Sequence, residues 1–571
     1  MQPNKFSAFQ YLSAIVIILA ILLILLMETI LNLTPPVSRD ALIHHLAIPK
    51  LWLKHRGFYE IKWASFSYFP MNVDLLYLFP LYFNKDFLAK FIHMGFGLGT
   101  AFLIFNYLKK RVNLIAGLLG VLVFLSTPAV FRLSTEAYVD LGLVFFTTAS
   151  LLAMIRYHDD EFKSIKWLLI SAICMGLALG TKYNALMIWF FLTLAIVFIH
   201  SRQTNNQWQS IKCGFLFFFV SLLVFSPWLI KNYILTGNPF YPLMRGLFNL
   251  SSFVTDEGTR SIVYGHTYMG LFQMRESMFG EGFIETLLIP LRYFFQGQDN
   301  SARYFDGVLN PLLILLAPFA FMNKQFLRDK LFFMTLAAFI ILTTTFLDHI
   351  RIRYILTAIP FLCILCVIGF VNIWNWSISL SKHIRYVLAA LILSAFTLAL
   401  SQNAFYIKNY YSNIAPWNYV TGRESRDDFI SRHSFSYPAI KYINESTPKN
   451  SRIRLLFLGR RGYYLDRIYE ADWSMGMNFI RSFVNISSDP DAFQKRLKSL
   501  GHTHWLIRKD MFHKFLVDNY SPDVVELFFK RISECLDMIY DKNGYAIYRI
   551  RQTHCASTNI GNPDFLDPYK R

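Results

Sequence analysis

The stretch Ser38–Glu60, SRDALIHHLAIPKLWLKHRGFYE, directly follows the first long apolar segment of the chain. It opens with an acidic residue, Asp40, where the chain leaves the bilayer, and continues as an apparent helix that contains His44 and His45. A half-buried carboxylate at a membrane interface can deprotonate a hydroxyl group and orient it for attack. We therefore interpret Asp40 as a candidate general base. Because Asp is also a good N-cap residue, capping of the helix that begins near Ala41 is an alternative role.

The composition is that of a polytopic membrane protein. The 571 residues are 54% hydrophobic and 16% charged, whereas soluble domains are about 25% charged. Apolar runs of about 20 residues recur, and each could cross about 30 Å of hydrocarbon. The net charge of +19 fits basic residues that orient the chain and face anionic lipid headgroups. No basic-aromatic module is visible in the sequence, so we predict no nucleic-acid partner.

The hydropathy pattern predicts about eleven transmembrane helices, and the loop charges orient them. The predicted spans are 11–31, 87–107, 113–131, 138–155, 167–181, 184–200, 212–230, 305–322, 331–347, 353–373 and 385–403. If the N-terminus is cytoplasmic, every short inner loop carries at least two basic residues and the short outer loops carry few, as the positive-inside rule requires. We expect a multi-pass protein of a bacterial inner membrane with its C-terminal domain in the periplasm.

Two domains are predicted. Residues 1–404 form the transmembrane domain, with two long outer loops at 32–86 and 231–304. Residues 405–571 lack long apolar runs and form a small α/β domain. Its expected strands are Ile453–Leu458, Trp505–Arg508 and Leu536–Ile550, and its expected helices are Pro438–Asn444 and Asp491–Leu500. The last strand segment contains Asn543-Gly544, a pair typical of a tight hairpin turn.

Cysteines in this domain bracket that hairpin. Cys535 and Cys555 lie nearly symmetrically about the Asn543-Gly544 turn, so their ends could meet. An oxidising compartment would permit a disulfide between them, and the sequence leaves this pairing open. By contrast, Cys363 and Cys366 have CxxC spacing inside an apolar helix, where we expect them to pack rather than to bind a metal.

Two acidic residues occur at the predicted outer end of the fourth span. Glu136 and Asp140 lie one helical turn apart in STEAYVDLGLVFF. A charge close to the hydrocarbon is costly, which makes its presence a functional hypothesis. Asp140 could be a second carboxylate of the site, with Glu136 holding acceptor or sugar hydroxyls beside it. Helix capping and the polarity of a span end are the structural alternatives.

Basic residues occupy the same predicted face. Lys182 lies in the turn GTKYNAL between two spans, and Arg351 and Arg353 lie in DHIRIRY at the start of the tenth span. Snorkelling and headgroup anchoring explain such cations structurally. Functionally, Lys and Arg suit a phosphate group, and cations would stabilise phosphate charge while a carboxylate handles a proton. This combination fits a lipid-phosphate-linked donor and a hydroxyl or amine acceptor.

A metal site is not predicted. Asp40 and His44 share one helix face at a spacing of one turn, but two ligands do not make a site. We expect His44 and His45 to lie at the headgroup level near the bound substrate. A divalent metal stays open as a cofactor, and the sequence assigns no residue to it.

With these features the chain resembles the GT-C superfamily of membrane glycosyltransferases. The nearer resemblance is to the branch of protein O-mannosyltransferases, the lipid A aminoarabinose transferase and the rhizobial lipopolysaccharide glycosyltransferases. It rests on an acidic residue early in the first outer loop (RDALIHHLAIPK), an Asp heading a span (AYVDLGL), a Gly-x-Lys turn (GTKYNAL) and an Arg-Tyr before a Pro-containing span (IRYILTAIP). The resemblance covers about residues 10–400.

The resemblance implies an inverting transfer at the periplasmic face, from a polyprenyl-phosphate sugar to an envelope glycolipid, polysaccharide or protein. It implies that Asp40 is the catalytic acidic residue and Asp140 the second one. Lys182 and Arg353 would then be the cations near the lipid phosphate. Many members carry an acidic pair in the first loop, whereas Asp40 here lies between Arg and Ala. That departure weakens any metal site built on such a pair.

Two functions from other classes are alternatives to the transferase hypothesis. A membrane transporter of lipid-linked sugar would usually show inverted repeats and helices broken at the midplane, and neither is visible in the sequence. A non-catalytic envelope receptor or scaffold would leave the charged residues of the outer face without a role. The transferase hypothesis requires these residues to converge on one cavity, and the other two hypotheses do not.

Overall fold

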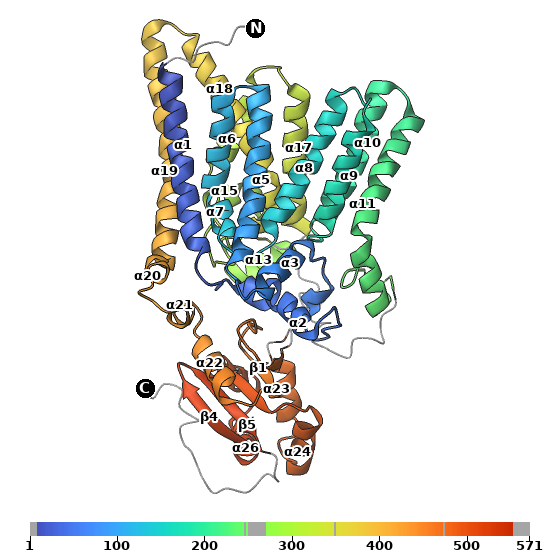
Figure 1. Cartoon of the computed structure of the whole chain (residues 1–571), viewed down its shortest axis with the longest axis vertical. Helices are drawn as coiled ribbons and strands as arrows, with labels where there is room; N and C mark the ends of the chain where they lie inside the picture. The colour runs from blue at the N-terminus through green and yellow to red at the C-terminus, as the bar shows by residue number, and fades with distance from the viewer. Residues whose placement is uncertain are drawn as a thin grey trace. The chain divides into compact units, whose positions relative to one another are not determined.

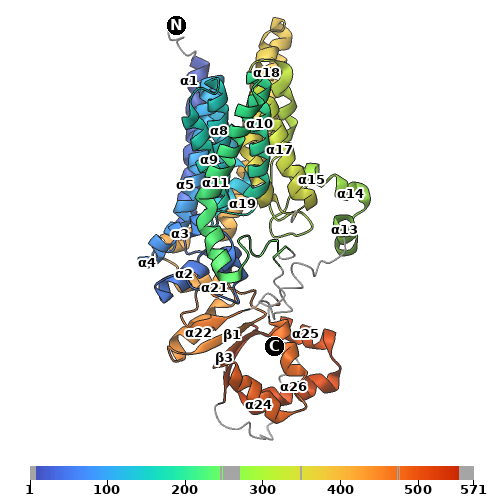
Figure 2. The same ribbon diagram turned by 90° about the vertical axis from the view of Figure 1, so that its right-hand side faces the viewer.

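The computed structural model describes residues 8–244, 247–248, 270–347, 350–471, 474 and 476–551. Residue contacts divide the chain into two compact units, whose ribbons are drawn in Figures 1 and 2. The first, here called the membrane unit, comprises Met1–Thr34, Phe69–Tyr241 and Met269–Arg423. The second, the C-terminal unit, comprises Pro35–Tyr68, Pro242–Tyr268 and Glu424–Arg571. The stretch that carries Asp40 therefore belongs to the same unit as the C-terminal domain.

The membrane unit is a bundle of long apolar helices (Figure 1). Among the described residues, eight helices are long and apolar enough to cross a membrane, and one bent pair raises the number to nine. The eight are α1 (Ala8–Asn32), α5 (Leu88–Arg111), α8 (Asp140–Asp159), α10 (Ala185–Thr204), α11 (Gln207–Thr236), α17 (Leu327–Leu347), α18 (Ile359–Ile378) with its preceding turn η4 (Ile352–Ala358), and α19 (Lys382–Ile414). The polytopic helical fold is confirmed, whereas the count of eleven spans is not.

The remaining predicted spans differ for local reasons. Helices α6 (Leu114–Ser126) and α7 (Pro128–Ser134) meet at an angle of 70°. Because Pro128 lacks a backbone N–H, it starts a new helix instead of continuing the old one. Helix α9 (Ile165–Leu179) has 15 residues, about 22 Å, and is shorter than the hydrocarbon is thick. The predicted span 305–322 contains only α16 (Leu312–Leu315) and the 3₁₀ turn η3 (Ala317–Met322).

Ion pairs join three of the helices at one end of the bundle. Arg111 of α5 lies 2.6 Å from Asp159 of α8 and 3.1 Å from Asp329 of α17. Arg328 also contacts Asp329, at 2.9 Å. Asp329 is buried, and a buried carboxylate is tolerated when it is paired and hydrogen-bonded. These contacts fix the ends of α5, α8 and α17 relative to one another.

Short helices fill the connections. They are η1 (Ala41–His45), α2 (Ala47–His55), η2 (Ser65–Tyr68), α3 (Asn72–Leu76), α4 (Leu78–Tyr82), α13 (Leu271–Phe279), α14 (Phe283–Leu287), α15 (Ile289–Phe295), α20 (Trp417–Val420) and α21 (Arg426–His433). A buried carboxylate holds α13 and α15 together, because Glu281 lies 2.6 Å from Arg275 and 3.0 Å from Arg292. Burial alone would raise the pKa of Glu281, but the two guanidinium groups hold it below its ordinary value.

The C-terminal unit is built on a mixed five-stranded sheet. Its strands are β1 (Arg452–Leu456), β2 (Ile468–Glu470), β3 (His504–Arg508), β4 (Leu536–Lys542) and β5 (Tyr545–Ile550), in the order β2-β1-β3-β5-β4. Strand β1 runs parallel to β2 and β3, and β5 runs antiparallel to β3 and β4. Alternation along β3 places Trp505 and Ile507 in one core and Leu506 in another. Helices α23 (Met477–Val484), α24 (Pro490–Ser499), α25 (Lys509–Asn519) and α26 (Pro522–Cys535) contribute to the first core, and α22 (Tyr437–Ser446) to the second.

The predicted strands and helices of this region are confirmed within a few residues. Asn543 and Gly544 both have positive φ, 55° and 78°, as a type I′ hairpin turn requires. Strand β2 was not predicted, because its three residues are too short to show alternation. Cys535 is buried, but Cys555 lies outside the described residues, so their pairing stays a prediction.

We predict that acid destabilises the C-terminal unit in two steps. Burial lowers the pKa of His504 to about 4. As the pH falls from about 6.5 toward 4, this histidine becomes protonated in the unfolded chain but stays neutral in the folded unit, so the free energy of unfolding decreases over that interval. Hydrogen bonding from His502 lowers the pKa of Glu470 to about 2, so its contribution is lost below about pH 4.5. Hydrogen-exchange protection of β1, β3 and β5 in the intact protein should fall in both intervals. Glu470→Gln should remove the lower step only, and pH-independent protection between 6.5 and 4 would contradict the role of His504.

Candidate functional site

An ion pair between a buried carboxylate and a half-buried lysine lies at the start of α8. Asp140 is the first residue of this helix and its side chain is 2% exposed. The Lys182 Nζ donates a hydrogen bond to Asp140 Oδ1 over 2.7 Å. Lys182 lies in the short turn between α9 and α10, so the pair joins two separate parts of the bundle. Removing either partner would leave an uncompensated charge in a poorly solvated place.

Aromatic rings orient the cations at this place. The Lys182 Nζ lies 4.8 Å from the centre of the Tyr354 ring, and the Arg353 guanidinium lies 5.1 Å from the same ring. Arg353 also lies 5.7 Å from the ring of Tyr138 and donates to the Tyr354 hydroxyl at 3.3 Å. Such cation–π contacts stabilise a charge without neutralising it. The structure therefore brings together three predicted site residues, Asp140, Lys182 and Arg353.

A second charged cluster surrounds Arg132 on α7. Its guanidinium contacts Glu136 at 3.4 Å, Asp299 at 2.8 Å and Asp306 at 3.3 Å. Arg351 lies 3.9 Å from Asp306 Oδ2, whereas Arg132 contacts Oδ1 of the same carboxylate. Two further predicted residues, Glu136 and Arg351, are therefore members of a cluster centred on Arg132. The predictions did not include Arg132, Asp299 or Asp306, although three charges in one short outer stretch, DNSARYFD, were a usable signal.

A histidine fixes the segment that leads into Asp140. The His93 Nδ1 donates to the carbonyl oxygens of Leu133 and Glu136, at 2.8 and 2.9 Å. Its Nε2 accepts a hydrogen bond from the backbone N–H of Leu141 over 2.9 Å. These three bonds tie the end of α7 to the first turn of α8. The sequence signal that could have found His93 is an ionisable residue inside an apolar span.

Close packing fixes the turn that carries Lys182. The backbone N–H of Asn72 donates to the Gly180 carbonyl oxygen at 2.8 Å. A Cβ atom at Gly180 would lie 2.1 Å from Asn72 Nδ2, so any other residue would push Asn72 away. Asn72 is itself held by the indole N–H of Trp228, at 2.7 Å. The Gly of the GTKYNAL motif therefore permits a backbone approach that holds the lysine turn in place.

Asp40 lies in the C-terminal unit, on a wide helical turn. Residues Ala41–His45 form a π-helical turn, closed by a hydrogen bond from the Leu46 N–H to the Ala41 carbonyl oxygen at 3.0 Å. Asp40 precedes this turn and its side chain makes no capping hydrogen bond to it. The capping role is therefore not seen, and a π-turn often marks a functional position. His45 is buried, and the third predicted residue of this segment, His44, is half-buried.

Within the described ranges, no group of three or more His, Cys, Asp or Glu side chains could hold a metal ion. The charged residues at the start of α8 form a carboxylate paired with cations instead, which suits an anionic ligand. We therefore assign no ligand set to a metal.

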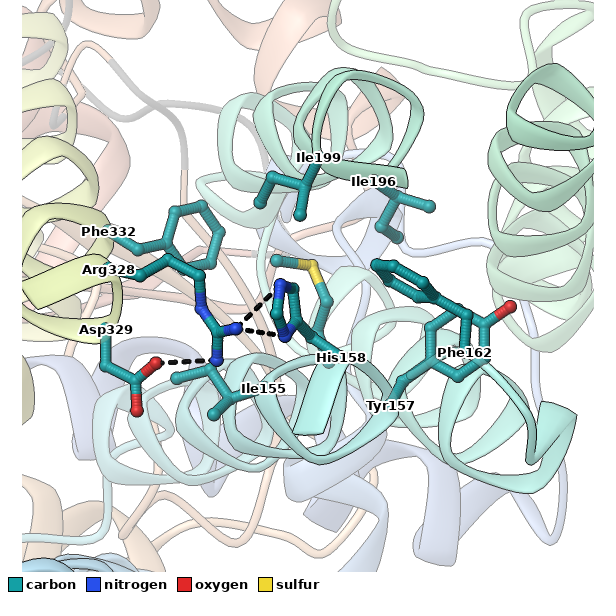
Figure 3. Close-up of a pocket in the computed structure, with 10 residues that line it drawn as sticks. Ile155, Tyr157, His158, Phe162, Ile196, Ile199, Arg328, Asp329 and Phe332 are labelled. Carbon is teal, nitrogen blue, oxygen red and sulfur yellow. Dashed lines mark hydrogen bonds and ion pairs between the residues drawn. The ribbon is translucent and has the colours of Figure 1, made fainter. Parts of the chain in front are cut away.

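A small cavity lies at the opposite end of α8, between this helix, α10 and α17. Figure 3 shows the Arg328 guanidinium between His158 and Asp329 at its edge. The cavity volume is about 20 Å³, enough for one water molecule. It is far too small for a sugar. The charged residues near Asp140 are therefore the better candidate for a ligand site.

Comparison with known proteins connects this arrangement to one class. Residues 77–230 match the family described as dolichyl-phosphate-mannose-protein mannosyltransferase. The crystal structure of ArnT from Cupriavidus metallidurans bound to undecaprenyl phosphate is similar with a TM-score of 0.55 at 13% identity, over 97% of this chain and 100% of that chain. AglB, the archaeal oligosaccharyltransferase of Archaeoglobus fulgidus in complex with an inhibitory peptide and a dolichol-phosphate, is similar with a TM-score of 0.55 at 11% identity, over 94% of this chain and 74% of that chain. A search of curated protein sequences finds no significant match.

The chain therefore has the fold of the GT-C superfamily of membrane glycosyltransferases. The resemblance inferred from the sequence is confirmed, together with the multi-pass helical architecture. The matched family segment, residues 77–230, contains both partners of the Asp140–Lys182 ion pair.

We predict that Arg353→Ala weakens binding of a polyprenyl phosphate by about tenfold or more, because a charge-assisted hydrogen bond contributes about 1.5–3 kcal/mol. The dissociation constant of undecaprenyl phosphate in detergent measures this effect. Lys163→Met is the control, since Lys163 is 74% exposed and follows the far end of α8. An equal loss for both variants, or no loss for Arg353→Ala, would contradict the phosphate role.

Proposed function

We propose that the protein transfers a sugar from a polyprenyl-phosphate-linked donor to a cell-envelope acceptor. The observation that supports this most is the ion pair of Asp140 and Lys182 beside Arg353, on a chain with the GT-C fold. The charges of Asp140 and Lys182 cancel, so Arg353 leaves the three residues with a net positive charge, and both cations lie over the Tyr354 ring. A lipid phosphate at a span end requires such a positive charge. The undecaprenyl phosphate of the similar ArnT structure agrees with a donor of this chemical class.

The cations act on the leaving group. As the bond between the anomeric carbon and the phosphate oxygen breaks, that oxygen takes the electron pair and the polyprenyl phosphate gains a negative charge. Lys182 and Arg353 stabilise this charge where it develops. Because Asp140 keeps Lys182 oriented before the donor arrives, little reorganisation is needed during the reaction. The proposed role of Asp140 is thus electrostatic.

The acceptor side needs a base. An acceptor hydroxyl attacks the anomeric carbon on the face opposite the phosphate, and this attack inverts the configuration of that carbon. The hydroxyl gives its proton to the Asp40 carboxylate. Asp40 suits this role because its side chain is half-buried at the start of a π-helical turn. His44 and His45 flank the acceptor in this proposal. Glu136 and Arg351 support the site through the cluster around Arg132.

The proposed location follows from the loop charges. With the N-terminus in the cytoplasm, the start of α8 and the C-terminal domain face the periplasm of a bacterial inner membrane. A glycolipid, a polysaccharide or a protein of the envelope is then the acceptor. The donor enters from the bilayer, where its polyprenyl chain is soluble.

We predict that Asp40→Asn lowers the turnover number of sugar transfer by about 10²–10⁴-fold, the usual contribution of a general base. Donor binding should change little, because the amide keeps the size of the side chain and the phosphate contacts lie elsewhere. Transfer from a polyprenyl-phosphate sugar in a single-turnover assay measures the rate, and Glu60→Gln in the same loop is the matched control. Retention of most wild-type turnover by Asp40→Asn would show that Asp40 is not the base.

A further inference from the structure

The first outer loop is bound to the C-terminal sheet domain. Leu51 and Trp63 of the loop pack against the core formed by one face of the sheet and α22. The Trp63 ring also lies 5.1 Å from the ring of Tyr469 on β2. Both contacts are apolar and lie within the C-terminal unit, which groups Pro35–Tyr68 with the sheet. The loop is therefore a structural part of that domain.

Polar contacts hold the loop backbone on both sides of Asp40. Before it, the Tyr464 hydroxyl donates to the Pro36 carbonyl oxygen at 2.6 Å. After it, the backbone N–H of Tyr463 donates to the Leu42 carbonyl oxygen at 3.2 Å. Both donors come from the segment that follows β1. Asp40 thus lies between two backbone carbonyl groups, those of Pro36 and Leu42, that accept hydrogen bonds from neighbouring tyrosines of the C-terminal domain.

Charged and stacking contacts extend this attachment. The Lys50 Nζ donates to the Tyr463 carbonyl oxygen at 2.8 Å and to Asp466 at 2.9 Å. The Arg460 guanidinium lies 5.4 Å from the Phe66 ring, and Phe66 stacks on His44 at 4.1 Å. The π-helical turn that follows Asp40 is therefore supported directly by the Tyr463 backbone N–H and, through Phe66, by the Arg460 side chain.

We infer that the C-terminal domain is a positioning element of the transferase: residues 460–466, through Tyr463, Tyr464 and Asp466, hold the first outer loop so that Asp40 meets the acceptor. The inference rests on the proposed role of Asp40 as the base. None of these residues touches the reacting atoms, so each is a positioning residue. A displacement of a catalytic group by about 1 Å can lower the reaction rate by about 10²-fold. We therefore expect a loss of this size when the attachment of the loop is loosened.

The test uses the intact protein and a charge reversal. Asp466→Lys places a cation beside Lys50 and Lys54, which lie 2.9 and 3.7 Å from Asp466. We expect a fall of about 10²-fold in turnover number with an unchanged donor KM. Lys50→Asp combined with Asp466→Lys recreates an ion pair but loses the hydrogen bond from Lys50 to the Tyr463 carbonyl oxygen, so it should restore part of the turnover. Tyr464→Phe removes one hydroxyl and should give a smaller loss.

A matched control and a second readout separate positioning from folding. Asp541→Lys makes the same charge change at a surface pair with Lys509, which lies 2.6 Å away on the edge of the same domain. It should leave turnover unchanged. Amide hydrogen exchange of residues 38–46 should accelerate in Asp466→Lys and not in Asp541→Lys, while β1 and β3 stay protected.

The two readouts can fail separately. If exchange at residues 38–46 accelerates in Asp466→Lys and turnover does not change, Asp40 is not the base and the proposed catalytic step fails, although the attachment exists. If turnover falls and exchange at residues 38–46 is unchanged, or if the double reversal recovers nothing, the positioning role is overturned.

Discussion

The ion pair between Lys182 and Asp140 is the constraint on which the membrane unit depends. A carboxylate at the end of an apolar helix is stable only when a cation and further dipoles compensate it. The start of α8, the turn after α9 and the segment before α18 must therefore stay close together. The bonds of His93 to the backbone around α8 and the close approach of Asn72 to Gly180 serve the same requirement. The phosphate site that we propose would need charges held in place in this way before the donor binds.

The remaining charged groups follow the same rule. Arg132 forms ion pairs with Glu136, Asp299 and Asp306. At the opposite end of the helix bundle, Arg111 forms ion pairs with Asp159 and Asp329. Each cluster joins segments that are distant in the sequence and thereby fixes their relative positions. The cluster around Arg132 includes Glu136, which lies four residues before Asp140, so it also supports the segment that leads into the site.

The sequence predicted the fold where a local pattern was sufficient. Long apolar runs predicted the helices, and Asn543-Gly544 predicted the hairpin. Local patterns could not show that Pro128 bends one span by 70° or that α9 is too short to cross alone. The sequence predicted Asp140, Lys182 and Arg353 as site residues because each is a charge at the end of an apolar run, and the structure brings the three together. It missed His93 and Arg132, whose roles depend on partners 40 or more residues away and become visible only when the bundle is assembled.

We propose that the start of α8 binds the phosphate of a lipid-linked donor. Native mass spectrometry of the protein with undecaprenyl phosphate tests it most directly, with the wild type compared against Lys182→Met. We expect a bound lipid of the expected mass on the wild type. Lys182→Met should lose most of that bound population, and Lys163→Met should keep it. Bulk phospholipid as the sole adduct of the wild type, or equal occupancy of all three proteins by undecaprenyl phosphate, would contradict the claim.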